Sequence, residues 1–114
     1  MRKLHIIAQA AIGNLRARYL DKPQLPSFFV HAAPYLDAMR TLDSCADVYG
    51  LDSGDSVVRY ALSNLGAWRG DFARAIKAEL REHLDAFATH GPRYLSFADG
   101  ERSEPKEPRR RESV

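Results

Sequence analysis

The chain has 114 residues, of which 45% are hydrophobic and 28% are charged, and its formal net charge is +2. This length predicts one domain, since single domains commonly hold roughly 100 to 200 residues. The composition is that of an ordinary soluble globular protein. So small a net charge gives no bulk electrostatic reason to expect a nucleic-acid or membrane partner.

Residues 3–20 form the first predicted helix. Its basic residues lie at the two ends rather than along one face, so we expect it to pack on other helices and not on a membrane. His5 interrupts the apolar run and leaves it shorter than a secretory signal requires, which favours a cytoplasmic protein. Apolar side chains recur at three- and four-residue spacing, the period of an amphipathic helix, at Leu4, Ile7, Ala8, Ala11, Ile12 and Leu15.

A second helical element is predicted over residues 27–42, after an extended connector that contains Pro23 and Pro26. Pro34 falls inside the apolar pattern, so we expect a single bent or broken helix. Residues 43–54 are rich in Asp, Ser and Gly and are predicted to be a polar connection, with room for a brief helical turn at 45–49.

The most informative stretch is 51–84, which predicts two amphipathic helices joined by a tight turn. The first of them is expected to begin at an Asp55 or Ser56 cap and to run to Trp68. Gly70 suits the end of that helix, and Asp71 suits the cap of the next, which covers about 72–88. Together they predict a helical hairpin at about 56–88.

The predicted fold class is therefore all-α, a compact four-helix bundle-like single domain over residues 1–98. Tyr94, Leu95 and Phe97 are expected to fold back as a short apolar clip. Residues 99–114 hold five basic and five acidic side chains and no large apolar residue except the final valine. Such a polyampholyte cannot bury enough surface to order itself, which predicts a disordered tail.

No catalytic residue, metal site or cofactor is predicted. Cys45 is the one cysteine, and its acidic neighbours are expected to raise the pKa of its thiol and make it a poor nucleophile. The four histidines lack the spacing of metal ligands. A turn followed by a helix cap explains the Asp and Ser residues of 52–56 without a calcium or phosphate ligand.

The leading functional hypothesis is a non-enzymatic accessory protein that binds an unknown protein partner or forms a homodimer. Two polar turns supply its predicted contact residues, because aromatic and arginine side chains dominate binding hot spots. The alternative interpretation of Trp68, which we favour, is a plug between two helices. The predicted contact residues are Tyr49, Asp52, Asp55, Trp68, Arg69 and Asp71.

The alternative function is a helix-turn-helix-like DNA-binding regulator that uses the helix at about 72–88. A recognition helix needs cationic donors for phosphates and guanine edges, and this helix carries several on one face. Neighbouring acidic residues dilute the positive field and weigh against this function. The candidate nucleic-acid contacts are Arg69, Arg74, Lys77 and Arg81.

One further pattern runs through about residues 52–84. It consists of Asp52-Ser53-Gly54, Val57-Val58, Leu62-Ser63-Asn64, Trp68-Arg69-Gly70, Ala73 and Ile76-Lys77-Ala78-Glu79-Leu80. This pattern is similar to small uncharacterised proteins of bacterial plasmids, phages and integrated mobile elements. The resemblance implies a small accessory protein and transfers no catalytic residue.

Overall fold

The computed structural model describes residues 1–96 and confirms a mostly helical chain. The predicted tail at 99–114, and Phe97 of the predicted clip, lie outside the described residues. Within residues 1–96, four α-helices, one short 3-10 helix and two very short strands follow in order: α1 (Leu4–Arg18), α2 (Ser27–Met39), β1 (Val48–Tyr49), β2 (Asp52–Ser53), α3 (Gly54–Asn64), α4 (Asp71–His90) and η1 (Gly91–Arg93).

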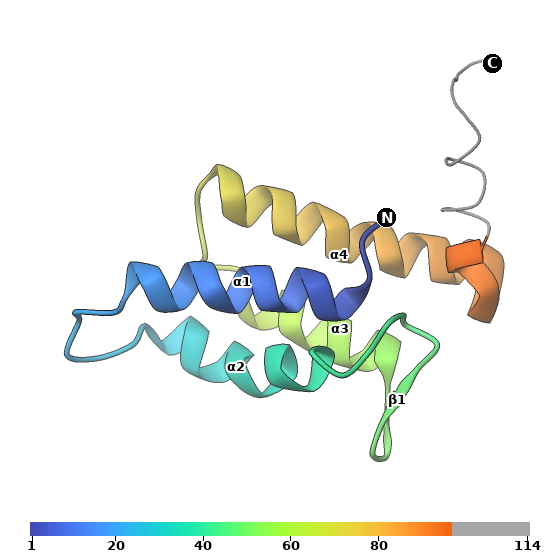
Figure 1. Cartoon of the computed structure of the whole chain (residues 1–114), viewed down its shortest axis with the longest axis horizontal. Coiled ribbons are helices and arrows are strands. Elements are labelled where there is room, and N and C mark those ends of the chain that lie inside the picture. The colour runs from blue at the N-terminus through green and yellow to red at the C-terminus, as the bar shows by residue number, and fades with distance from the viewer. Residues whose placement is uncertain (97–114) are drawn as a thin grey trace.

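The helices enclose one core. In Figure 1, α1 crosses the molecule between α4 and α2, with α3 behind it. The contacts agree with this view, because α1 packs on both α2 and α4, and α3 packs on the same two helices. The fold is thus compact and mostly helical, while a regular four-helix bundle stays a prediction.

The predicted apolar stripes do face inward. Leu4, Leu15 and Leu80 have no exposed surface, and Ile76 is 1% exposed. Burying an aliphatic side chain of this size contributes about 1.5–3 kcal/mol to stability. Pro34 lies inside α2, which is a single helix as predicted but ends at Met39 rather than at residue 42.

The helix ends differ from prediction. α3 begins at Gly54, so Asp55 lies inside its first turn and does not cap it with its side chain. The same helix ends at Asn64 instead of continuing to Trp68. Asp71 is the first residue of α4 and follows Gly70, whose φ of 112° only glycine adopts readily.

The predicted polar connection contains a β-hairpin, which the sequence analysis missed. Val48 pairs with Ser53, and Tyr49 pairs with Asp52, in an antiparallel ladder. Gly50 has a φ of 62° and so supplies the left-handed backbone that tight hairpin turns require. Strands of two residues are too short to show a period-2 pattern, so hydropathy gave no sign of them.

Gly54 is held in a space that has no room for a side chain. A Cβ atom at this position would lie 2.8 Å from each of three carbonyl oxygens, those of Ser44, Cys45 and Asp47. The backbone N–H of Gly54 donates to the carbonyl of Asp47 at 2.7 Å. This contact closes the base of the hairpin and starts α3 at the same point.

We therefore expect Gly54→Ala to destabilise the protein by about 1–3 kcal/mol, the usual cost of overpacking a tight site. Gly13→Ala is the matched control, because Gly13 is an exposed residue of α1 with no atom within 4 Å of its would-be Cβ. It should stabilise by up to about 1 kcal/mol through helix propensity. Urea unfolding of both variants measures the difference, and equal midpoints would contradict the crowding described at Gly54.

Candidate functional site

Residues 42–47, which we call the junction, link α2 to the hairpin and cap the start of α1. The backbone N–H of Leu4 donates to the carbonyl of Asp43 at 3.1 Å, and that of His5 donates to the carbonyl of Leu42 at 2.9 Å. The first N–H groups of a helix have no partner within it, so carbonyls from another segment satisfy them here. The Asp43 carboxylate also lies 3.8 Å from Lys3.

The junction caps α3 in the same way. Beside the bond from Gly54 to Asp47, the N–H of Asp55 donates to the carbonyl of Cys45 at 3.1 Å. The Asp47 carboxylate in turn accepts from the N–H of Asp43 at 2.7 Å and from that of Ser44 at 3.2 Å. One short segment therefore supplies backbone acceptors to two helices, and its own shape is fixed by an aspartate.

A buried chain of polar groups holds the junction from the other side. The N–H of Cys45 donates to the Tyr94 hydroxyl at 2.9 Å, and this hydroxyl also bonds to Nδ1 of His83. Nε2 of His83 lies 2.7 Å from the carbonyl oxygen of Arg2. All of these hydrogen-bonding groups are satisfied when the Tyr94 hydroxyl donates to Nδ1 of a neutral His83 and its Nε2–H donates to the Arg2 carbonyl.

These hydrogen-bonded groups form a buried polar cluster that joins four parts of the sequence. Its members are Cys45, His83, Tyr94 and the Arg2 carbonyl. His83 comes from the middle of α4, and Tyr94 follows η1. The Arg2 side chain also forms a bidentate ion pair with Glu79 of α4, from Nε to Oε1 at 2.8 Å and from Nη2 to Oε2 at 2.6 Å. The N-terminus is therefore fastened to α4 through both its backbone and its side chain.

The Cys45 thiol is 1% exposed, and burial raises its pKa to about 11. The increase in pKa was predicted from the sequence, but its main cause is burial, and the acidic neighbour Asp55 contributes a lesser part. Burial also raises the pKa of Tyr94. A protonated, buried thiol is a poor nucleophile at neutral pH, so we assign this cluster a structural role, that of holding the junction against α4.

We expect Tyr94→Phe to destabilise the fold by about 1–3 kcal/mol, because it leaves the Cys45 N–H and His83 Nδ1 buried without their shared partner. Tyr49→Phe is the control, since Tyr49 is 45% exposed and its hydroxyl can exchange its partners for water. Chemical denaturation measures the loss, and alkylation of Cys45 should quicken in the Tyr94 variant alone. Equal stability of both variants would refute the role given to the hydroxyl.

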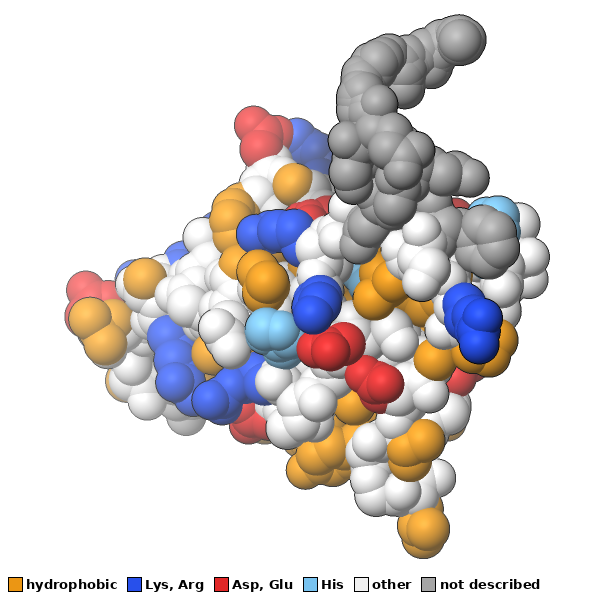
Figure 2. Space-filling view, turned by 45° about the vertical axis from the view of Figure 1, so that its right-hand side comes forward, with side chains coloured by type: hydrophobic (Ala, Val, Ile, Leu, Met, Phe, Trp, Pro, Cys, Tyr) orange, Lys and Arg blue, Asp and Glu red, His pale blue; other side chains and the backbone are white. Residues whose placement is uncertain are grey.

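The hairpin carries the first half of the predicted contact surface. It projects from the body of the molecule, with hydrophobic side chains at its end (Figure 2). Leu51 is fully exposed at the turn, and Val48 and Tyr49 are 64% and 45% exposed. Asp52 is exposed beside them, whereas Asp55 at the hairpin base pairs with Arg59 at 2.8 Å.

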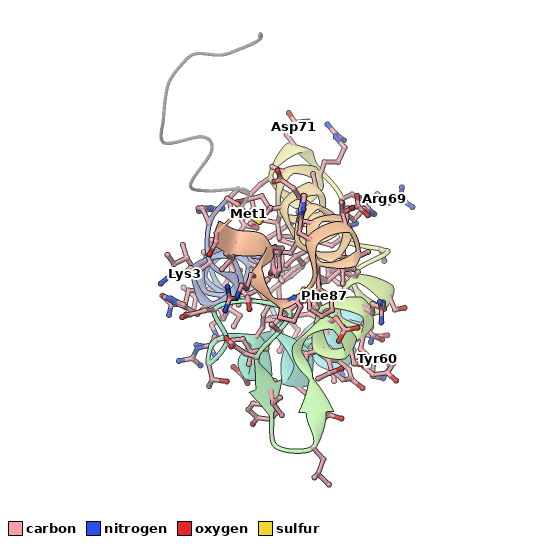
Figure 3. All side chains as sticks on the ribbon, turned by 90° about the vertical axis from the view of Figure 1, so that its right-hand side faces the viewer. Met1, Lys3, Tyr60, Arg69, Asp71 and Phe87 are labelled. Carbon is pink, nitrogen blue, oxygen red and sulfur yellow. The ribbon has the colours of Figure 1, made fainter. Side chains whose placement is uncertain are left out.

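The second half lies at the other end of α3, and the structure does not bring the two halves together. Arg69 and Asp71 are exposed near the start of α4, on the opposite side of the molecule from the hairpin (Figure 3). Trp68 is 2% exposed and meets the ring of Phe72 edge-on at 6.1 Å. Its side chain is therefore part of the core, in agreement with the plug interpretation.

The four candidate nucleic-acid contacts differ in their neighbours. Lys77 donates to the carbonyl of Trp68 at 2.6 Å, and its pKa is lowered by burial and then by the positive charges of Arg81 and Arg69. Arg74 instead forms an ion pair with Asp71. The positive charges of Arg69 and Arg81 thus act on Lys77, whereas the charge of Arg74 is partly neutralised by Asp71.

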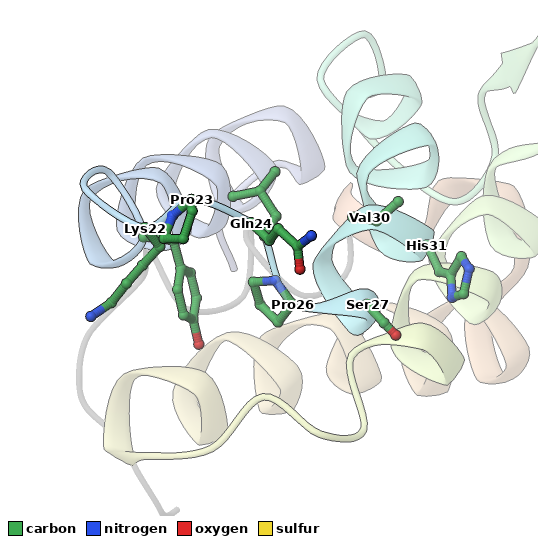
Figure 4. Close-up of a pocket in the computed structure, with 9 residues that line it drawn as sticks. Lys22, Pro23, Gln24, Pro26, Ser27, Val30 and His31 are labelled. Carbon is green, nitrogen blue, oxygen red and sulfur yellow. The ribbon is translucent and has the colours of Figure 1, made fainter.

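The turn between α1 and α2 is hollowed on two sides, which the sequence analysis did not anticipate. One hollow of about 690 Å³ lies between this turn and the start of α2, with Val30 and His31 at its edge (Figure 4). A second of about 400 Å³ reaches Arg16 and Phe29. The two share Tyr19, Lys22 and Leu25.

Residues 1–96 hold no group of three His, Cys, Asp or Glu side chains placed to bind a metal ion. Within the same range, no helix combines the length and the apolar character that a membrane crossing requires. Comparison of the chain with protein-family models, with curated proteins and with solved structures finds no match.

Proposed function

We propose that this chain is a non-enzymatic protein-interaction module that contacts its partner through the projecting hairpin. The observation that carries the proposal is the hairpin end, where Leu51 is fully exposed beside Val48 and Tyr49. Single apolar side chains on a surface are ordinary, but a cluster on one protrusion is typical of a contact site. The resemblance to small proteins of mobile elements supplies the accessory role that we propose.

The hairpin is suited to binding because its shape is set in advance. The turn at Gly50 and the hydrogen bond from Gly54 to the Asp47 carbonyl fix both of its ends. A surface that is already ordered loses less conformational entropy when it binds. Tyr49 presents a large ring with a polar end, a combination that contact surfaces favour.

Leu51→Asp should weaken partner binding by roughly ten- to a hundredfold, because burying a leucine side chain contributes about 1.5–3 kcal/mol. Stability should not change, since Leu51 makes no buried contact. Affinity purification of the tagged protein from its own cells, followed by quantitative mass spectrometry, compares the recovered partners. Ala75→Asp, at an exposed position on α4, is the control. An identical partner list for the Leu51 variant, together with unchanged self-association of that variant, would overturn the proposal.

A second candidate function, DNA binding, is favoured by the grouping of Arg69, Lys77 and Arg81. A cluster of cations can neutralise adjacent phosphates, and each neutralised phosphate makes binding more sensitive to salt. The ion pair between Asp71 and Arg74 weighs against DNA binding, because Asp71 places a carboxylate at the N-terminus of α4. We therefore place this function second.

Arg69→Glu combined with Arg81→Glu tests it, since both side chains are exposed and the pair spares the bond of Lys77. If α4 binds duplex DNA, a low-salt mobility-shift titration should show a complex that the double variant weakens at least roughly tenfold. Arg40→Glu combined with Arg93→Glu, at two exposed positions outside α4, makes the same change in net charge and is the control. Absence of a complex with the unmodified protein at micromolar concentration would remove DNA binding from consideration.

A further inference from the structure

The hollows of the α1–α2 turn combine apolar lining with positive charge. Leu25 and Val30 are 48% and 52% exposed there, and neighbouring Leu20 is 83% exposed. Lys22 lines both hollows, and Arg16 lines one of them. Within residues 1–96, no carboxylate lies within ion-pair distance of these two cations. The turn is therefore an apolar depression with unneutralised positive charge at its rim.

The hairpin has the complementary features. Residues 41–58 hold four aspartates and no Lys, Arg or His. Asp43 and Asp55 have cationic neighbours, Lys3 and Arg59. Asp47 and Asp52 have none within ion-pair distance among the described side chains. The hairpin is thus an apolar projection with negative charge. The smaller hollow of the α1–α2 turn, which both Arg16 and Lys22 line, is an apolar depression with positive charge.

We propose that the partner of the hairpin is a second copy of this chain, whose α1–α2 turn receives Leu51 while its Lys22 and Arg16 face Asp52 and Asp47. This inference rests on the proposed function and names its partner. Figure 1 places the hairpin and the α1–α2 turn apart from each other on the molecule, so one protomer can use both at once. Opposite charges at the rim orient the two surfaces and exclude like-charged pairings.

The contact is head-to-tail, so each bound protomer still offers one free hairpin and one free hollow. Such heterologous contacts produce rings when the rotation closes and open chains when it does not. One hairpin end in one hollow buries less surface than the roughly 1,200–2,000 Å² of a stable complex. The association is therefore weak, and it falls as salt screens the charges.

Sedimentation equilibrium of the full chain over about 10 µM to about 1 mM covers the weak end of specific affinities and tests the inference. The unmodified protein should associate at low salt and dissociate at high salt. Asp52→Lys and Lys22→Glu should each weaken association at least roughly tenfold, because each turns an attraction into a repulsion. Both side chains are exposed, so folding is preserved.

Mixing the two variants decides between this contact and a general charge effect. In the mixture, the unmodified hairpin of the Lys22→Glu variant fits the unmodified hollow of the Asp52→Lys variant, and the basic hairpin of the latter matches the acidic hollow of the former. The mixture should therefore recover association that neither variant shows alone. Asp85→Lys and Arg93→Glu, an exposed pair outside both surfaces, are the controls and should associate like the unmodified protein. Recovery in the mixture supports the inference.

A protein that stays monomeric at every concentration, or variants that do not rescue each other, would overturn it. Binding of the hollow to anionic lipid vesicles, lost in Lys22→Glu but kept in Asp52→Lys, would assign the hollow to a membrane and likewise overturn it. The proposed function is judged separately. If Leu51→Asp loses recovered proteins while the chain is monomeric, the hairpin binds a different protein and only the self-association fails.

Discussion

The fold depends on the backbone carbonyls of one short segment, the junction at residues 42–47. These carbonyls accept the N–H groups that α1 and α3 leave unsatisfied at their starts. Helix starts that are buried without partners cost free energy, so the two helices can meet here only because the junction supplies acceptors to both. Tyr94 then fixes the junction through the N–H of Cys45. Losing this arrangement would uncap two helices and open the base of the hairpin together.

The sequence predicted the helices well because their information is periodic and local. The stripes that include Leu15, Ile76 and Leu80 repeat at helical spacing, and burial of those side chains follows directly. The helix caps were predicted wrongly for the same reason. Asp55 and Asp71 are good local caps, but carbonyls of the junction, which lies outside the helix, replaced the first, and Gly70 precedes the second. Tertiary partners of this kind leave no periodic signal.

The candidate sites also differ in whether a local sequence pattern could predict them. Tyr49 and Asp52 were identified from turn composition and do lie on an exposed projection. The buried polar cluster was missed, although His83 falls on the apolar face of its helix, where a polar residue is unusual. That placement was the one available signal. Its partners Tyr94 and Arg2 lie 11 and 81 residues away, distances at which a single sequence carries no pairing information.

The crowding around Gly54 has a consequence for tracing the ancestry of this chain. At a position that three carbonyl oxygens enclose, any other residue must displace the backbone of the junction or the first turn of α3. Exposed residues face no such limit, whereas the histidine and tyrosine that hold the same segment are constrained by the hydrogen bonds they share. A sequence search that gives extra weight to Gly54, His83 and Tyr94 at their relative spacing should therefore detect distant homologues better than a search that weights all positions equally.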